Sequence, residues 1–215
     1  MRAWLWNRLI ELTADLVAPL RCAACDAQLL RRALFCEACA ATVQRIQSQT
    51  EPLALGAYGG ALAQALRRLK YGNRPDLAQP LGLLLRQLVE QQHNSLGPID
   101  VVIPVPVPRS RLLERGYNQA ALLARHVTGP LGARFAPMAM SRRDGSIKQA
   151  ALGRRERLEN LQGAFCIVQP RAVRSQRVLL VDDVCTTGAT MHTCTTCLLD
   201  AQAAAVRQLV VALVP

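Results

Sequence analysis

The chain has 215 residues, enough for one ordinary domain with a small appendage, and 51% of them are apolar, which excludes wholesale disorder. Its formal net charge of +11 favours acidic partners such as nucleic acid, phosphorylated small molecules or an anionic membrane surface. Aromatic residues make up only 4%, so the core must consist mainly of Leu, Val and Ala.

Residues 1–20 predict an amphipathic helix with one apolar face. Packing of this face on the rest of the protein is one interpretation. Contact with a membrane surface is the other, and Trp4 and Trp6 favour it. Because charges such as Arg2 and Arg8 interrupt the apolar run, the stretch fits neither a signal peptide nor a membrane span. We therefore expect a cytoplasmic protein whose thiols stay reduced.

Two C-x2-C pairs, Cys22 with Cys25 and Cys36 with Cys39, are separated by ten residues. Each pair can grip one tetrahedral ion from a tight turn, and four thiolates suit structural zinc. Two disulfides or redox-active pairs are the alternatives, but a redox motif normally opens a helix near a βαβ unit. We predict a closed, structural four-cysteine zinc finger resembling a double zinc ribbon.

A third C-x2-C pair, Cys194 with Cys197, falls on a predicted helix with no second pair nearby. Free cysteine behaves as a small hydrophobic residue, so we interpret this pair as packing rather than as a metal site.

From Pro52 onward, strands alternate with helices, which predicts an α/β fold with a parallel sheet covered on both faces. We therefore divide the chain into residues 1–50, with the N-terminal helix and zinc finger, and residues 51–215, with the α/β domain. The expected strands are LALGAYG, IDVVIPVPV, GAFCIV, RVLLVDDV and QLVVALV.

One motif joins a strand to a threonine- and glycine-rich turn. The apolar run 178–181 stops at two adjacent carboxylates, Asp182 and Asp183, and the chain then enters TTGAT. Ligands of parallel sheets bind beyond the carboxyl ends of strands, where this turn offers N–H groups at a helix start. The phosphate-binding candidates are Thr186, Thr187, Gly188, Ala189 and Thr190. With carboxylates as acceptors for sugar hydroxyls, the pattern predicts a ribose 5-phosphate site; a strand end followed by a plain turn is the alternative.

Basic side chains follow the strand IDVVIPVPV. Arg109, Arg111 and Arg115 are expected in a loop at its carboxyl end, where guanidinium groups would suit a pyrophosphate. A solvated basic loop is the alternative.

The run LLVDDVCTTGAT resembles the phosphoribosyl pyrophosphate (PRPP) motif of type I phosphoribosyltransferases. The combination of motifs also resembles the ComF family over nearly the whole chain. It consists of the four-cysteine segment, LKYG, VPVPRSRLLERGYNQAALLA, KQAALGRRERLENLQGAF and LLVDDVCTTGAT. Members of that family resemble phosphoribosyltransferase domains with an N-terminal zinc finger and are linked to DNA uptake or to the use of external DNA.

The resemblance implies that Asp182, Asp183 and the TTGAT turn bind PRPP, with Mg²⁺ bridging its pyrophosphate. It also implies a mobile flap at residues 142–160. The candidate catalytic residues are Asp182, Asp183 and Lys148. Lys148 or Arg154 would stabilise departing pyrophosphate, although Lys148 also fits an exposed flap charge.

We therefore expect a ComF-like protein of natural competence and DNA utilization that binds PRPP and single-stranded DNA, with other competence proteins as candidate partners. An active phosphoribosyltransferase with an unidentified acceptor, in nucleotide salvage or another pathway, is the alternative. Lys70 is a further cation for the phosphates or for nucleic acid, or else it caps a helix C-terminus.

Overall fold

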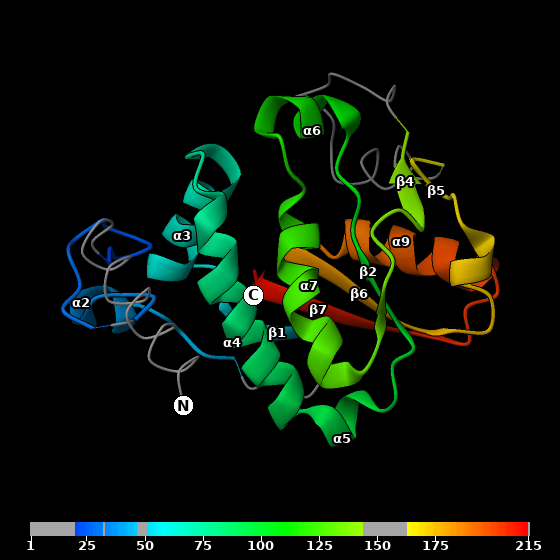
Figure 1. Cartoon of the computed structure of the whole chain (residues 1–215), viewed down its shortest axis with the longest axis horizontal. Coiled ribbons are helices and arrows are strands. Elements are labelled where there is room, and N and C mark those ends of the chain that lie inside the picture. Colours follow the sequence, from blue (N-terminus) through cyan, green and yellow to red (C-terminus); the bar gives the residue numbers. More distant parts are fainter. Residues whose placement is uncertain (1–19, 32, 47–50, 144–162, 215) are drawn as a thin grey trace, which may run out of the picture.

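A five-stranded parallel sheet forms the centre of the molecule (Figure 1). The computed structural model describes residues 20–31, 33–46, 51–143 and 163–214. The strand order is β1-β7-β6-β2-β3, with bounds β1 (Leu53–Ala57), β2 (Val101–Pro104), β3 (Arg134–Phe135), β6 (Arg177–Cys185) and β7 (Ala205–Leu213). The predicted α/β fold class with a parallel sheet is confirmed.

Three helices cover one face of this sheet. They are α3 (Gly60–Tyr71), α4 (Ala78–Gln91) and α7 (Gln119–Leu131), and Figure 1 shows α4 and α7 crossing the strands. Leu66, Leu81 and Leu123 from these helices share a core with Leu179 and Leu209 of the sheet. The helices are amphipathic, so their apolar stripes face the strands and remove this surface from water.

The other face is covered by α9 (Ala189–Asp200) and by a separate two-stranded ribbon, β4 (Met140–Arg142) with β5 (Phe165–Ile167). Here Leu198 packs in one core with Leu180 and Val210 of the sheet. The prediction that GAFCIV is a strand of the parallel sheet is therefore wrong. Its residues pair antiparallel with β4, because the ribbon uses its apolar side chains, such as Phe165, to extend the cover over this face.

Short segments complete the chain. These are α2 (Glu37–Ala40), η1 (Pro75–Leu77), α5 (His93–Leu96), α6 (Arg109–Arg115) and η2 (Pro170–Ala172). Residues 20–46, which contain the first four cysteines, lie against α3 at one end of the molecule (Figure 1). We call this segment the cysteine knuckle; its Cys22 and Ala24 pack with Ala61 of α3.

Candidate functional site

The two adjacent carboxylates lie near the carboxyl end of β6. This strand continues through Asp182 and Asp183 to Cys185, one residue beyond the predicted strand RVLLVDDV. The extension has a clear cause, because Val184 and Cys185 still pair with the final residues of β7. The phosphate-loop candidates start directly afterwards, at Thr186.

Asp183 is buried, with 3% of its side chain exposed, and its Oδ2 lies 2.6 Å from Nζ of Lys70. Lys70 belongs to the last turn of α3. A buried carboxylate without a partner is strongly destabilising. The ammonium group of Lys70 provides this partner for Asp183. From the sequence, Lys70 is a candidate for phosphate or nucleic-acid binding or for helix capping, and this ion pair was not predicted. The available signal was its rarity, because the chain has only two lysines and this one stands in the LKYG motif.

Asp182 differs from its neighbour in its environment. Burial raises the pKa of its carboxyl well above the usual value, the negative charge of Asp183 adds to this rise, and the charge of Lys70 opposes it. One carboxylate oxygen of Asp182 accepts a hydrogen bond from the backbone N–H of Asp183 at 2.8 Å. A proton, a bound cation or ligand hydroxyl donors would each relieve the charge repulsion of this pair.

The TTGAT turn presents its polar groups outward. Thr186 and Thr187 are exposed, and Gly188 has a φ of +76°, a left-handed conformation that glycine adopts without strain. Helix α9 starts at Ala189, so its first-turn N–H groups follow the threonine hydroxyls. The turn therefore combines the three elements of a phosphate site: hydroxyls, backbone amides and a helix N-terminus.

The three predicted arginines lie on helix α6, so the prediction that they occupy a loop is wrong. Helix formation brings Arg111 and Glu114 onto one face, where they pair at 2.9 Å. Arg115 stacks over the ring of Tyr71 at 4.8 Å and donates a hydrogen bond to Gln119 at 3.0 Å. Arg115 thus reaches the LKYG turn, whereas Arg111 pairs within its own helix. Binding of pyrophosphate by Arg109, Arg111 and Arg115 stays a prediction.

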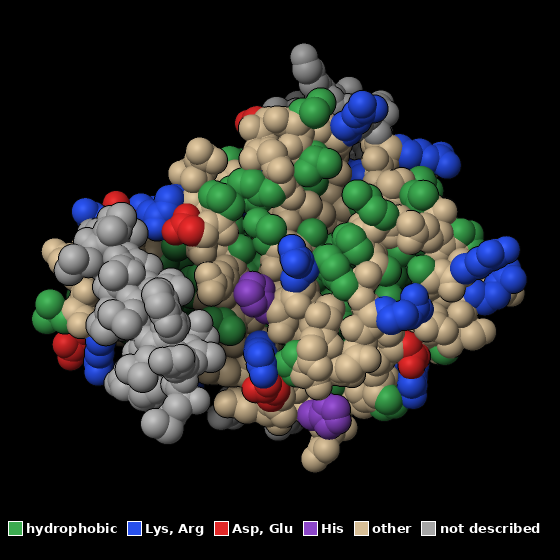
Figure 2. Space-filling view, in the orientation of Figure 1, with side chains coloured by type: hydrophobic (Ala, Val, Ile, Leu, Met, Phe, Trp, Pro, Cys, Tyr) green, Lys and Arg blue, Asp and Glu red, His purple; other side chains and the backbone are tan. Residues whose placement is uncertain are grey.

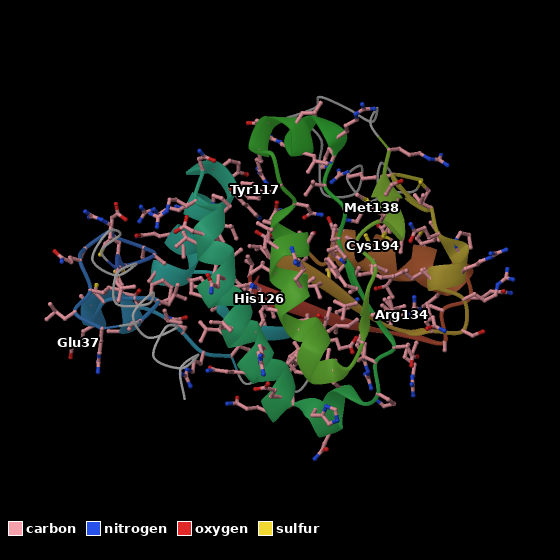
Figure 3. The ribbon with its side chains drawn as sticks, viewed as in Figure 1. Glu37, Tyr117, His126, Arg134, Met138 and Cys194 are labelled. Atoms are coloured by element: carbon pink, nitrogen blue, oxygen red, sulfur yellow. The ribbon has the colours of Figure 1, made fainter. Side chains whose placement is uncertain are left out.

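The RGYNQ motif connects α6, α7 and α3. Gly116 ends α6 in a left-handed conformation, and Asn118 caps α7 by accepting from the N–H groups of Ala120 and Ala121. The hydroxyl of Tyr117 donates to the backbone carbonyl of Leu69, and Figure 3 shows Tyr117 between α3 and α6. The motif therefore fixes the end of α3, the turn that carries Lys70.

The four cysteines of the knuckle converge on one point. All four Sγ atoms lie within 4.8 Å of one another, and Sγ of Cys25 is 3.7 Å from Sγ of Cys36. Zinc–sulfur bonds of about 2.3 Å in a tetrahedron place sulfurs about 3.8 Å apart, so the cysteines are positioned to bind a metal ion. The 3.7 Å contact joins the two C-x2-C turns, as ligation of one shared ion by both turns would require.

Hydrogen bonds to Cys22 favour its thiolate form, which can bind a cation. Burial raises the pKa of the Cys22 thiol, but backbone N–H groups of Cys25, Cys36 and Ala24 outweigh it and lower the value to about 6. In contrast, burial and the neighbouring thiols raise the pKa of Cys39 to about 12. The Cys39 thiol therefore resists ionisation unless a metal ion balances the charge of the cluster.

Cys194 and Cys197 pack as predicted. Cys194 is fully buried in the core on the α9 face, and Cys197 contacts the carbonyl oxygen of Phe165 at 3.8 Å. Throughout the described part of the chain, the knuckle provides the only group of metal-binding side chains. Burial raises the pKa of Cys185, and the charge of Asp182 adds to this rise.

Two predictions lie outside the described residues: the N-terminal amphipathic helix, and most of the flap with Lys148 and Arg154. None of the helices within the described ranges is both long enough and apolar enough to cross a membrane.

Comparison with known proteins decides the family. No family model matches the chain. Competence protein F of Haemophilus influenzae is 30% identical over 174 residues, covering 80% of this chain and 75% of the relative. This chain belongs to the competence protein F (ComF) family. The DNA utilization protein YhgH of Escherichia coli K12 is 32% identical over 152 residues, covering 70% of this ComF chain and 66% of YhgH. For YhgH of E. coli strain CFT073, the match covers 59% of the relative's length.

Solved structures show more distant likenesses to this ComF chain. The glutamine PRPP amidotransferase of Bacillus subtilis, in complex with ADP and GMP, has a TM-score of 0.47 and 19% identity. The match covers 67% of this chain and 30% of the amidotransferase.

Proposed function

We propose that this ComF chain binds PRPP at the carboxyl end of β6 and acts in the cytoplasm in DNA utilization. The observation that carries the proposal is the succession of Asp182, Asp183 and, after two further strand residues, an exposed threonine–glycine turn at a helix start. The turn would hold the 5-phosphate, and the carboxylates would accept hydrogen bonds from the ribose hydroxyls. The names of the relatives support the connection to DNA.

Mg²⁺ would accompany PRPP, because its pyrophosphate carries a concentrated negative charge and Mg²⁺ prefers phosphate and carboxylate oxygens. When bound, the ion would neutralise the pyrophosphate. The chain's own residues would hold the ribose and its 5-phosphate and keep water from one side of the ligand. The metal of the cysteine knuckle would be zinc in a structural role, since four thiolates close its coordination shell.

Calorimetry with PRPP and Mg²⁺ tests the proposal. We expect one binding site per chain in the wild type. Asp183→Asn should weaken binding about 10- to 100-fold, since hydrogen bonds to charged groups contribute about 1.5–3 kcal/mol. Asp200→Asn, at the exposed end of α9, should bind PRPP like the wild type. Undiminished binding by Asp183→Asn would contradict the assignment of the site.

Turnover is a separate question with its own assay. Release of pyrophosphate from PRPP across a panel of bases, abolished by Asp183→Asn, would show a phosphoribosyltransferase with a defined acceptor. Binding without release across the panel would favour PRPP as a ligand or regulator.

Single-stranded DNA is a second candidate ligand, favoured by a basic concavity of about 740 Å³. Arg134, Arg171 and Arg174 line this concavity at the amino end of β3 and around η2, far along the strands from the TTGAT turn. Figure 3 labels Arg134 at this edge, and Figure 2 shows basic side chains along it. Among the described residues, these arginines form no ion pair with a carboxylate, so their charge is available to phosphates.

Aromatic stacking contributes little to this second proposal. Phe165 is buried, and Tyr117 uses its hydroxyl inside the protein, which leaves Tyr71 as an exposed ring. Binding of DNA should therefore be electrostatic and strongly dependent on salt.

A salt titration of oligonucleotide binding measures this dependence. The slope for single strands is about −0.7 per phosphate contact, so Arg171→Glu with Arg174→Glu should reduce its magnitude by about 1.4. Arg86→Glu, on the exposed face of α4, is the matched control, since that residue pairs only with Glu90. Equal slopes for both variants would argue against the concavity as the DNA site.

A further inference from the structure

The last turn of α3 connects the cysteine knuckle to the carboxylates of β6. Arg68 lies on the knuckle side of this turn. Its Nη1 reaches the backbone carbonyl oxygens of Cys22, Ala23 and Ala24 at 3.4–3.5 Å, and its Nη2 pairs with Asp26 at 2.9 Å. The guanidinium group therefore holds the turn that carries the first two cysteines.

Lys70 lies two residues further along the same turn and faces the opposite way, toward Asp183 at 2.6 Å. Between them, the carbonyl oxygen of Leu69 accepts a hydrogen bond from Tyr117. Both cations are largely shielded, with 25% of the Arg68 side chain and 22% of the Lys70 side chain exposed. The turn is thus fixed by contacts to three separate parts of the molecule.

The cysteine knuckle and the carboxylates of β6 depend on this turn of α3 for different reasons. The knuckle contains little apolar core of its own, so its order depends on the metal ion and on contacts such as those of Arg68. The Asp183 carboxylate is buried, so its position and charge depend on Lys70. A knuckle without metal would release Arg68, and the last turn of α3 would then hold Lys70 less firmly.

We propose that metal binding by the cysteine knuckle strengthens PRPP binding through this turn of α3. Lys70 is the positioning residue that holds the Asp183 carboxylate for the ribose hydroxyls, and Arg68 transmits the state of the knuckle to Lys70. This inference rests on the proposed PRPP site. Metal and PRPP bind at separate places, so the effect is a coupling between sites and must be reciprocal.

The first test compares PRPP affinities by calorimetry in the zinc-loaded protein. Coupling between sites is typically about 5- to 150-fold, so Arg68→Ala should weaken PRPP binding at least about fivefold while one zinc ion remains bound per chain. Arg86→Ala removes an exposed arginine from α4 and should leave PRPP affinity unchanged.

A variant series separates transmission through Lys70 from general loosening of the fold. If Arg68 acts through Lys70, adding Arg68→Ala to Lys70→Gln should cause no further loss of PRPP affinity. A further loss equal to that in the wild-type background would overturn the proposal, because Arg68 would then act independently of Lys70.

Because the coupling is reciprocal, it can also be measured through the affinity for zinc. Saturating PRPP should tighten zinc binding, measured by competition with a chelator, by the same factor by which zinc tightens PRPP binding. The Arg68→Ala variant should lose this effect. Wild-type protein that binds PRPP with no difference between its metal states would overturn the coupling and leave the PRPP site intact. Wild-type protein that binds no PRPP in either state would instead overturn the proposed function and the coupling with it.

Discussion

The cysteine knuckle and the phosphate loop achieve their geometry in different ways. The loop follows a nine-residue strand that pairs with neighbours on both sides and is packed on both faces, so the sheet positions it without any ligand. The knuckle contains a single four-residue helix and one isolated bridge, between Arg21 and Gln28. Its order therefore depends on the four thiolates and on docking to α3. We expect the knuckle to need a metal ion for its order and the sheet to need none, and this difference predicts where each is vulnerable.

Removal of the metal should have the largest effect, and it should unfold the knuckle while the sheet stays folded. A chelator at neutral pH should abolish hydrogen-exchange protection of the knuckle amides, because structural zinc supplies their folding free energy. The amides of β6 should stay protected. Cys36→Ser should reproduce the effect, whereas Cys197→Ser should leave zinc stoichiometry unchanged. Loss of protection throughout β6 after chelation would show that the sheet also depends on the metal.

Gly60→Ala tests docking of the knuckle on α3 by steric means. Gly60 has a φ of +47°, and an added Cβ would lie 2.5 Å from the carbonyl oxygen of Thr42. We expect a loss of about 1–3 kcal/mol in the free energy of unfolding, measured by denaturant titration. Gly129→Ala in α7 meets no atom of another segment within 4 Å, and Pro130 restricts the residue before it, which offsets the gain from removing a helical glycine, so the free energy of unfolding should change little. Similar effects of the two substitutions would refute tight docking.

Asn118→Ala tests how the start of α7 stabilises the candidate phosphate site, at a residue outside the knuckle. The substitution removes the cap of α7 and the hydrogen bond to the carbonyl of Val105, at an expected cost of about 1 kcal/mol. Thermal unfolding should report a decrease in Tm of about 2–4 °C for a chain of this size. Zinc affinity should not change, and a decrease in zinc affinity would mean that the two regions share this contact.

Asp182→Asn should change stability with the opposite sign to Asn118→Ala. The folded protein disfavours the ionised carboxyl, since burial and Asp183 raise the pKa of Asp182. The ionised group therefore destabilises the fold above that raised pKa, and the penalty disappears as the pH falls below the ordinary value. We expect the variant to have a higher Tm than the wild type at pH 7 and an equal Tm near pH 3. A lower Tm at pH 7 would show that the charge is well compensated. Affinity for PRPP should also fall as the wild-type carboxyl becomes protonated.

Local spacing was sufficient to predict the parts of the molecule that are close in sequence. Both motifs could be found from the sequence: the two C-x2-C pairs, and the run from Asp182 through TTGAT. The residues of each pair, and those of the run, lie within a few positions of one another, so local chain geometry brings them together. Cys194 and Cys197 have the same spacing but lie in a core, and the absence of a second pair was enough to distinguish them.

Contacts between distant segments were not predictable in this way. The pairing of Lys70 with Asp183 and the contacts of Arg68 with the knuckle depend on where α3 ends relative to β6. The apolar run GAFCIV is equally suited to a sheet strand and to an outer ribbon, and only packing against α9 decides between them. Helix α6 was missed because its seven residues are too short for a clear helical period.

Nuclear magnetic resonance titration of the labelled protein with PRPP and Mg²⁺ tests the central claim most directly. Saturable shifts should concentrate in the backbone amides of residues 186–190 and of Asp182 and Asp183, with a smaller response at Lys70. The amides around Arg171 and Arg174, at the basic concavity, should not shift. Shifts centred on the concavity, or none at residues 186–190, would contradict the assignment of the phosphate site.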